Sequence, residues 1–407
     1  MAITKITKGI NAGNYRVRIQ PKDPVTKLPI HVPSKVAPTR QKAKELERSM
    51  WGEYEDKKSI PASFDNDSFA ELFEQFCKDE NEAGRWTNTT YLDWKYTCRL
   101  VKKYFGKMKL QDVTESHIRR FARSYIKDHN AWVSRNSTID RRLQHLRTYF
   151  SGLIEKGIIK INPVPKNALH KFFRLDEFTV PDEKYVFTED EVKNIKERIL
   201  EELKSLSPSY WGSRIAILIA LDTGMRPQEI QALKWNQLIN DGNFKVFQIN
   251  DSWNEKLHRL NGHLKSRVPG FTRLTLPISK EVEEILNIYL QKQKDILNEK
   301  EITNTNGFIL LNLRDKRLTQ LGYPIGQANM NNIIKKVAKL VNVNNQDKQI
   351  SMYTCRHTKA TKLGNTPGMS YPWAASRLGH TVEMFMKRYV HVDKDRSQQM
   401  LELVTLA

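Results

Sequence analysis

The chain has 407 residues, which is longer than one hydrophobic core usually organises, so we expect two or three domains. Hydrophobic residues make up 39% and charged residues 28% of the sequence, a balance that excludes fibrous and intrinsically disordered proteins. Lys and Arg number 67 against 46 Asp and Glu, and the resulting net charge of +21 favours a polyanionic partner, above all nucleic acid.

Cysteines and apolar runs indicate the compartment. Cys77, Cys98 and Cys355 are too few and too scattered for a disulfide framework or a zinc module, which indicates a reducing cytoplasm. The first ten residues lack the apolar run of a signal peptide, and the longest strongly apolar stretch, residues 215–221, is too short to span a membrane. A membrane surface would also attract a charge of +21, but no long basic amphipathic helix is evident. We therefore expect a cytoplasmic protein without membrane contact.

A basic module is expected over residues 1–62. Residues 1–44 hold ten Lys and Arg and one acidic residue, a net charge of +9. Residues 15–19 alternate apolar and cationic side chains at the period of a β-strand, and a turn, a second extended run near residues 28–32 and a Lys-rich helix from about Thr39 follow. We predict a small sheet with one helix that grips phosphates, the alternative being a solvated sheet that only keeps the protein soluble. Its candidate DNA contacts are Arg16 and Arg18.

Residues 66–175 are predicted to form a helical domain with the densest positive charge. Residues 95–175 hold nineteen Lys and Arg against five acidic residues, a net charge of +14. Thr114 is a predicted helix cap, and Ser137 with Asp140 resembles a capping box that opens a second amphipathic helix. The charge density favours a DNA-facing surface over an ordinary solvated face. The candidate DNA contacts here are Arg119, Arg120, Arg141 and Arg142.

The proline-containing residues 162–186 lack a long periodic segment and are predicted to be an interdomain linker. Residues 184–407 are predicted to be a mixed α/β domain, mostly helical, in which Thr188 and three acidic residues open a helix. Strand-like runs are found over residues 244–249, 272–276 and 308–311. The predicted fold class is thus multidomain and mainly α, with small β-sheets.

The segment Thr-Gly-Met-Arg-Pro-Gln-Glu-Ile, residues 223–230, carries the first chemical motif. Gly224 suits a helix C-terminus, while Pro227 disfavours helical geometry at Arg226 and suits the first position of the next helix. Arg226 is therefore expected at a corner, where its guanidinium can donate two parallel hydrogen bonds to a phosphate and Glu229 can orient it from behind. The alternative is an ordinary surface Arg–Glu pair.

A second constellation lies near the C-terminus. Tyr353 and Arg356 are three residues apart and share one face of a predicted helix. His380 and Tyr389 are nine residues apart, which a straight helix would place on opposite sides. Gly379 can end one helix there and Thr381 can cap the next, so we expect His380 at a turn and Tyr389 at the end of the following helix.

These motifs together resemble the catalytic signature of the tyrosine recombinases, the phage integrase family. The motifs are Thr-Gly-Met-Arg226-Pro-Gln-Glu, Arg356-His-Thr, Leu-Gly-His380 and Arg-Tyr389-Val-His-Val. The resemblance spans the last domain, and the preceding layout resembles the arm-site-binding and helical core-binding domains of integrases. It implies a site-specific recombinase that cleaves and rejoins DNA through a 3′-phosphotyrosine intermediate, integrating and excising a phage or conjugative transposon.

The resemblance also implies roles and partners. Arg226 and Arg356 would clamp the scissile phosphate with help from His380, and Tyr389 would be the nucleophile. Lys265 matches the family's β-hairpin lysine, which protonates the leaving 5′ oxygen, although Lys256, Arg259, Arg267 and Arg273 crowd the same hairpin. The implied partners are double-stranded DNA attachment sites of arm and core type, a homotetramer on DNA, an excisionase and a host DNA-bending protein.

One position departs from the family's pattern. Tyr353 stands where His or Lys is common, and a phenol is a poor base at neutral pH. His357 is no obvious substitute, because it lies one step further around the helix. The departure favours the alternative of an inactive, sequence-specific DNA-binding protein, while a type IB topoisomerase or a resolvase would share the chemistry without the arm-binding module.

The expected chemistry needs no metal and no cofactor. Two arginines and a histidine can stabilise the negative charge of a phosphorane-like transition state, and neighbouring cations favour a phenolate nucleophile. Neither the carboxylate clusters of a two-metal nuclease nor a phosphate-binding Gly-rich loop with Lys is evident. His258 and His263 have no further ligands at metal-binding spacing.

Overall fold

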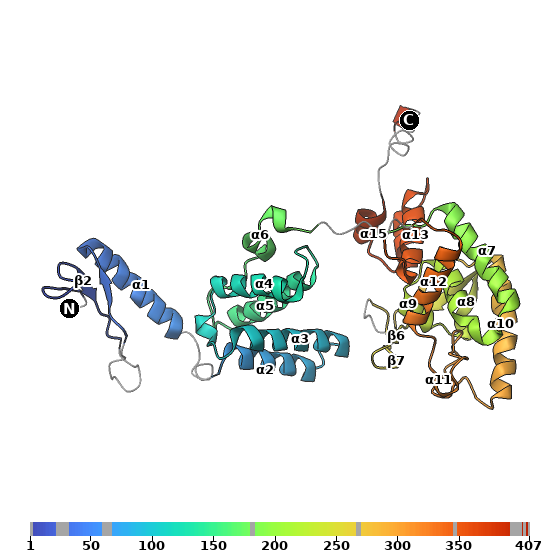
Figure 1. Cartoon of the computed structure of the whole chain (residues 1–407), viewed down its shortest axis with the longest axis horizontal. Helices are drawn as coiled ribbons and strands as arrows, with labels where there is room; N and C mark the ends of the chain where they lie inside the picture. Colours follow the sequence, from blue (N-terminus) through green and yellow to red (C-terminus); the bar gives the residue numbers. More distant parts are fainter. Residues whose placement is uncertain are drawn as a thin grey trace. The chain divides into compact units, whose positions relative to one another are not determined.

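The structure is a computed structural model with two compact units, residues 1–181 and 182–407, each described here by itself (Figure 1). It describes residues 3–21, 32–58, 67–179, 184–265, 270–344, 348–390, 401 and 404–405, with the backbone alone over 53–58. The predicted fold class is confirmed, because helices dominate both units and the sheets are small. The division into three domains stays a prediction. No helix within the described ranges is long and apolar enough to cross a membrane.

The N-terminal module is a three-stranded antiparallel sheet with one helix. The elements are β1 (Ile3–Lys5), β2 (Tyr15–Val17), β3 (Lys35–Ala37) and α1 (Arg40–Lys58), and the strand order is β1-β2-β3. Val17 and Ile19 are buried against α1 while Arg16 and Arg18 are exposed, which is the alternation that the sequence showed. The outer strands were not predicted, because three residues carry too little periodicity, and the run near 28–32 lies almost wholly outside the described residues.

The rest of the first unit is a helical bundle. Its helices are α2 (Phe69–Glu82), α3 (Asn88–Phe105), α4 (Glu115–His129), α5 (Thr138–Glu155) and α6 (Ala168–Phe172), with 3-10 turns η2 (Leu110–Asp112) and η3 (Leu175–Glu177). Thr114 precedes α4, and the Ser137 hydroxyl accepts a hydrogen bond from the Asp140 backbone N–H at the start of α5. Both predicted helix starts are therefore confirmed, and the predicted apolar faces of α4 and α5 form the buried core.

The predicted linker is wrong over its first half. Val164, Leu169 and Phe172 are buried in the core of the helical bundle, and the backbone N–H of Thr179 donates to the carbonyl of Val133. The short helix α6 packs its apolar residues against this core. A helix of five residues is too short to show helical periodicity in the sequence.

The second unit is built around a buried helix. Its helices are α7 (Glu189–Ser205), α8 (Gly212–Thr223), α9 (Pro227–Gln231), α10 (Lys280–Glu299), α11 (Lys316–Gln320), α12 (Gln327–Leu340), α13 (Met352–Asn365), α14 (Tyr371–Leu378) and α15 (Val382–Tyr389), with 3-10 turns η4 (Pro208–Tyr210) and η5 (Trp235–Gln237). Thr188 caps α7, as predicted, and it also forms a capping box with Glu191. Helix α8 packs against α7, α9, α10, α12 and α13, so residues 215–221 form the centre of this core (Figure 1).

Two small antiparallel sheets lie in the same unit. One has the order β4-β5-β8, from Leu238–Asp241, Phe244–Ile249 and Arg273–Leu274, and the other pairs β6 (Trp253–Asn254) with β7 (Arg259–Leu260). The predicted strands at 244–249 and 272–276 are therefore found, the second of them shorter. The predicted strand at residues 308–311 is not formed, and only two isolated β-bridges occur there, at Phe308 and Leu311. These residues are apolar because they are buried in the core, and this apolar run had suggested a strand.

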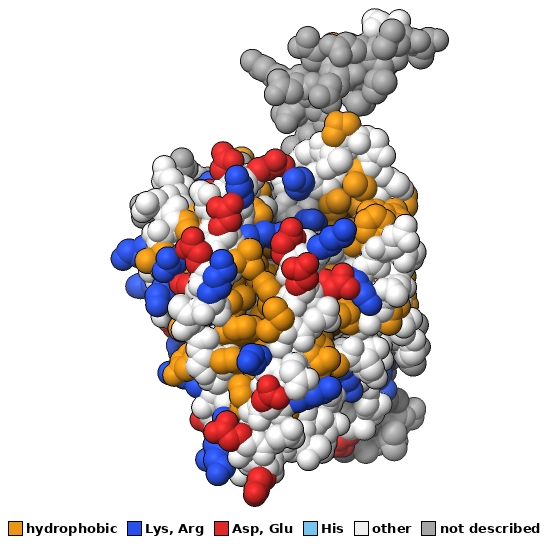
Figure 2. All heavy atoms as spheres, turned by 90° about the vertical axis from the view of Figure 1, so that its right-hand side faces the viewer, with side chains coloured by type: hydrophobic (Ala, Val, Ile, Leu, Met, Phe, Trp, Pro, Cys, Tyr) orange, Lys and Arg blue, Asp and Glu red, His pale blue; other side chains and the backbone are white. Residues whose placement is uncertain are grey.

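One face of the second unit mixes charges of both signs. Figure 2 shows Lys and Arg side chains interspersed with Asp and Glu, and apolar side chains exposed between them. Such a face lacks the one-sided positive charge that attracts a phosphate backbone.

Candidate functional site

The corner that holds Arg226 is built from local chemistry. Gly224 ends α8 in the left-handed conformation at φ 64°, Arg226 is extended at φ −73° and ψ 146°, and Pro227 is the first residue of α9. A Cβ at residue 224 would lie 2.8 Å from a methyl group of Leu378, so this glycine also admits the close approach of α14. The structure confirms three predictions: the helix end at Gly224, the extended backbone of Arg226 and the helix start at Pro227.

Glu229 lies behind Arg226 and also holds a second arginine. Its carboxylate accepts hydrogen bonds from the backbone N–H of Arg226 at 3.0 Å, from Arg226 Nη1 at 2.8 Å and from Arg273 Nη2 at 2.6 Å. Burial alone would raise the pKa of the Glu229 carboxyl, but Arg273, Arg226 and Arg356 outweigh it and lower that pKa. Glu229 is therefore a buried carboxylate that fixes two guanidinium groups, and sequence reasoning had not paired it with Arg273.

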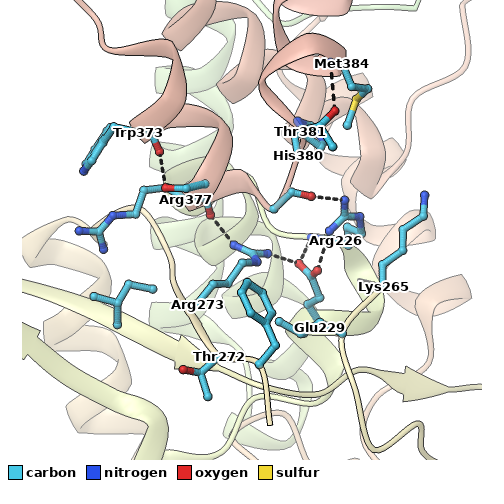
Figure 3. A pocket seen from close by; sticks show the side chains of 15 residues that line it. Arg226, Glu229, Lys265, Thr272, Arg273, Trp373, Arg377, His380, Thr381 and Met384 are labelled. Atoms are coloured by element: carbon cyan, nitrogen blue, oxygen red, sulfur yellow. Dashed lines mark hydrogen bonds and ion pairs between the residues drawn. The ribbon is translucent and has the colours of Figure 1, made fainter. Parts of the chain in front are cut away.

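Backbone carbonyls at the end of α14 accept further hydrogen bonds from Arg226 and Arg273. Arg226 Nη2 donates to the carbonyl of Gly379 at 2.8 Å, and Arg273 donates to the carbonyl of Arg377 (Figure 3). Gly379 lies at φ 68°, and a Cβ there would come within 2.8 Å of Arg273 Nε. Only glycine fits this position without moving the arginines.

Arg356 projects from α13 into the same cluster. Its Nη1 donates to the carbonyl of Gly224 at 2.7 Å, and its Nη2 donates to the carbonyl of Leu378 at 2.7 Å and to Nε2 of His380. Burial and the nearby Arg226 lower the pKa of the Arg356 guanidinium to about 9. A guanidinium only donates, so Nε2 of His380 accepts and its Nδ1 carries the proton.

His380 is therefore a neutral imidazole with an N–H to offer. Burial and Arg356 lower the pKa of His380 to about 2. Its buried Nδ1 has no hydrogen-bond partner among the described residues. A buried N–H without a partner is costly, and an acceptor on a bound ligand would satisfy it.

Tyr389 is the last residue of α15, as predicted, after Gly379 ends α14 and Thr381 caps α15. Its side chain is 3% exposed, and its ring stacks on His380 with centroids 5.4 Å apart. Burial raises the pKa of the Tyr389 phenol, while the nearby Arg356 and Arg388 oppose that rise. Gly364 of α13 lies so close that a Cβ there would be 2.4 Å from the Tyr389 carbonyl oxygen.

The structure brings His357, and not Tyr353, to the hydroxyl of Tyr389. His357 Nδ1 forms a hydrogen bond of 3.1 Å with the Tyr389 hydroxyl. Tyr353 is 36% exposed and donates to Gln228 at 3.3 Å, and no hydrogen bond between described residues joins it to Arg356 or His380. This contact could not be predicted from the sequence, because it depends on how α15 packs on α13.

A cavity of about 770 Å³ opens beside this cluster. Arg226, Lys265, Arg377 and His380 are among its lining residues, and Figure 3 shows Lys265 extending beside Arg226. Partial burial, Arg226 and Arg356 lower the pKa of Lys265, which makes its ammonium group a stronger acid. Arg273, a competing hairpin cation in the sequence, is already bound to Glu229.

Two other cations of that hairpin do not reach the cavity. Lys256 and Arg259 are exposed and do not line it, and Arg267 lies outside the described residues. Lys265 therefore remains the candidate proton donor.

The proposed DNA contacts divide into exposed and buried residues. Arg16, Arg18, Arg119, Arg120 and Arg141 are exposed, so they remain candidates. Arg142 is 3% exposed, and its Nη1 donates to the Asp93 carbonyl at 2.7 Å and to Thr97 at 2.6 Å. The assignment of Arg142 to the DNA-facing surface is therefore wrong, because its guanidinium holds α5 against α3 inside the bundle.

Metal-ligating side chains do not gather in the described part of the chain. No group of three or more His, Cys, Asp or Glu there could hold a metal ion. His258 stacks on Tyr323, and His263 Nδ1 hydrogen-bonds the carbonyl of Leu264 at 2.7 Å, so both imidazoles have other contacts.

Comparison with known proteins places this site in a family. Residues 186–396 match the phage integrase family, and residues 68–171 match its SAM-like domain. Tyrosine recombinase XerC of Thermodesulfovibrio yellowstonii is 24% identical over 264 residues, which is 63% of this chain and 72% of XerC.

Solved structures share the fold at low identity. The Tn1549 transposon integrase in complex with a circular intermediate DNA has a TM-score of 0.61 at 21% identity, over 82% of this chain and 99% of that one. XerH recombinase bound to a palindromic difH substrate has a TM-score of 0.57 at 16% identity, over 83% and 85% of the two chains. Lambda integrase bound to a core site has a TM-score of 0.50 at 15% identity, over 97% of each chain. With more than half of its residues matched, the chain belongs to the phage integrase family of tyrosine recombinases and is a site-specific DNA recombinase.

Proposed function

We propose that Tyr389 cleaves DNA by attacking the scissile phosphate. Its phenol loses a proton to water, its Oη bonds to phosphorus, and the bond from phosphorus to the 5′ oxygen breaks. Lys265 protonates the leaving oxygen. The 3′-phosphotyrosine conserves the energy of the phosphodiester, so a 5′ hydroxyl of another strand can reverse the step and join the exchanged strands.

The observation that carries the proposal is the convergence of five groups from distant segments. Arg226 donates to the carbonyl of Gly379, the residue before His380. His380 in turn contacts Arg356 and stacks on Tyr389, and Lys265 lines the cavity beside this cluster. Two guanidinium groups and the free His380 N–H suit the equatorial oxygens of a pentavalent phosphorus. The arginines are fixed by Glu229 and backbone carbonyls before any ligand arrives, which is the preorganisation that charge stabilisation requires.

The substrate proposed is double-stranded DNA carrying core-type and arm-type attachment sites of a mobile element. Exposed Arg119, Arg120 and Arg141 of the helical bundle would contact core-site phosphates, and Arg16 and Arg18 would contact the arm site. The solved relatives support this, because the Tn1549 integrase and lambda integrase were solved in complex with DNA.

Assembly is proposed to be a homotetramer on two paired sites, with an excisionase and a host DNA-bending protein as further partners. The lambda integrase tetramer bound to a Holliday junction supports the tetramer. Leu401 and Val404 in the C-terminal tail are 65% and 74% exposed, and apolar side chains so exposed suit a neighbouring protomer. Most of this tail lies outside the described residues.

A covalent-adduct assay tests the proposal. The full-length protein should form a protein–DNA bond with a nicked core-site duplex in the presence of a chelator and without nucleotide. Tyr389→Phe should bind the same duplex and form no adduct, because it lacks only the attacking oxygen. An adduct formed by Tyr389→Phe would place the nucleophile elsewhere, and no adduct from the unmodified chain would support an inactive DNA-binding protein.

A further inference from the structure

A chain of hydrogen bonds leads away from the attacking oxygen. The Tyr389 hydroxyl lies 3.1 Å from Nδ1 of His357, and Nε2 of the same imidazole lies 3.2 Å from Nζ of Lys184. All three residues belong to the second unit. His357 is 7% exposed and contacts the reacting atom directly.

We propose that His357 is a further catalytic residue of this recombinase. It donates its Nδ1–H to the Tyr389 oxygen and stabilises the phenolate that forms there. Lys184 is the positioning residue that holds His357 in this donor tautomer. The proposal rests on Tyr389 being the nucleophile.

The direction of the two hydrogen bonds follows from Lys184. The side chain of Lys184 reaches solvent, although partial burial and Arg388 lower the pKa of its ammonium group. A protonated ammonium group has no lone pair to offer. Nε2 of His357 must therefore accept from Lys184, and the single imidazole proton of neutral His357 resides on Nδ1. Nδ1–H then points to the phenol oxygen, and this bond strengthens when the oxygen becomes negative.

The surroundings of His357 disfavour a role as base. Burial, Lys184, Arg388 and Arg356 together lower the pKa of His357 to about 3. Accepting the phenol proton would create an imidazolium among these cations. The phenol proton therefore leaves to water, and His357 keeps its own proton throughout.

The segment that carries Lys184 is fixed against α13. The backbone N–H of Phe187 donates to the Thr358 hydroxyl at 3.0 Å, and that hydroxyl donates to the carbonyl of Thr354 at 2.9 Å. Phe187 is 4% exposed and belongs to the core of the unit. Phe187 is thus bound to α13, the helix that carries His357, and Lys184 lies only three residues before Phe187.

The first test is a direct measurement on the unmodified full-length protein. Two-bond nitrogen–proton NMR of 15N-histidine-labelled protein, with His357→Asn used for assignment, reports the tautomer. We expect His357 to be neutral with its proton on Nδ1 at pH 7. A proton on Nε2 would overturn the proposal, and the tautomer is read from the unmodified protein, the variant serving only to assign its signal.

The second test separates stabilisation of the phenolate from structural support. His357→Phe keeps a flat ring without an N–H, and we expect it to slow single-turnover cleavage of a nicked core site about 100-fold. His357→Asn retains an N–H near the position of Nδ1 and should recover most of that loss. Replacing Tyr389 by 3-fluorotyrosine, whose phenol ionises more easily, should rescue His357→Phe. Equal rates for the Phe variant and the parent, or a failure of both rescues, would overturn the proposal.

Lys184 and the proposed function are tested in the same assay. Lys184→Gln should slow cleavage about tenfold, because an amide does not impose one tautomer, and Lys184→Arg should restore the rate. An inactive Tyr389→Phe with a fully active His357→Phe would refute the inference alone. An adduct formed by Tyr389→Phe would refute the proposed function and the inference with it.

Discussion

Gly364→Ala provides a sharp test of how α13 positions Tyr389, the proposed nucleophile. The glycine lies within α13, where its backbone angles suit any residue, so alanine brings no backbone strain there. Its added Cβ would lie 2.4 Å from the Tyr389 carbonyl oxygen and 2.8 Å from the carbonyl carbon. The backbone at Tyr389 must therefore move away from α13.

The size of that movement follows from the contact distance. Ordinary van der Waals contact begins near 3.4 Å, so the Tyr389 carbonyl has to shift by about 1 Å. Misplacing a reacting group by about 1 Å costs on the order of 100-fold in rate. The same overpacking should lower the free energy of unfolding by about 1–3 kcal/mol.

The assay is single-turnover cleavage of a nicked core-site duplex, followed by the covalent adduct on denaturing gels. Gly152→Ala is the matched control, because Gly152 also lies in a helix and a Cβ there meets no atom within 4 Å. The control should cleave like the parent, while Gly364→Ala should bind DNA normally and cleave about 100-fold more slowly. A stable Gly364→Ala that cleaved within about threefold of the parent would show that the end of α15 adjusts freely, and would refute the reasoning.

Three further predictions concern the buried polar networks. Glu229→Gln should reduce single-turnover cleavage about 10- to 100-fold with DNA binding retained, because an amide holds Arg226 without the balancing charge. Arg142→Ala should lower the free energy of unfolding in urea by about 3 kcal/mol, whereas Arg141→Ala should leave stability almost unchanged and reduce the salt dependence of DNA binding. Burial lowers the pKa of His145 to about 4, so its contribution to stability is complete above pH 6.5 and is lost as the pH falls toward 4; His145→Gln should flatten this slope in urea titrations.

Local signals in the sequence predicted the corners of the site. Gly224 with Pro227 and Gly379 with Thr381 were recognised because helix ends are decided by the residues at the end itself. These corners place Arg226, His380 and Tyr389, so most of the candidate site follows from short-range chemistry. The three-residue strands β1 and β3 lack such signals, because their pairing is made with distant segments.

Long-range pairings were beyond the sequence. Arg273 contacts Glu229 across 44 positions, and His357 contacts Tyr389 across 32, so no local pattern joins either pair. Gly364 was likewise overlooked, because a glycine within a helix reveals its role only when the neighbour that needs the space is known. These contacts arise from the packing of α13, α15 and the small sheet.

Arg142 is a case in which a usable signal was present. It lies three residues after Ile139 and four before Leu146, both of which are fully buried on the apolar face of α5. A cation at that position on a helix must be buried with a partner or lie at the edge of the apolar stripe. Net charge alone does not distinguish a phosphate-binding arginine from one that crosslinks two helices, and position on the helix does.

The proposed site holds more positive than negative charge, and this excess suits it to bind a phosphate. Arg226, Arg273 and Arg356 surround one carboxylate, Glu229, and Lys265 adds a fourth positive charge beside them. Partial burial, Arg226 and Arg356 lower the pKa of Lys265, so the free protein holds Lys265 as a stronger acid than an isolated lysine. An arriving phosphate offsets the repulsion, and its nonbridging oxygens can receive hydrogen bonds from the arginines and the free N–H of His380. As the phosphorus–oxygen bond breaks, negative charge grows on the 5′ oxygen, and an acidified Lys265 is suited to give up its proton there. In the proposed mechanism, the excess of positive charge thus contributes to binding, to transition-state stabilisation and to protonation of the leaving group.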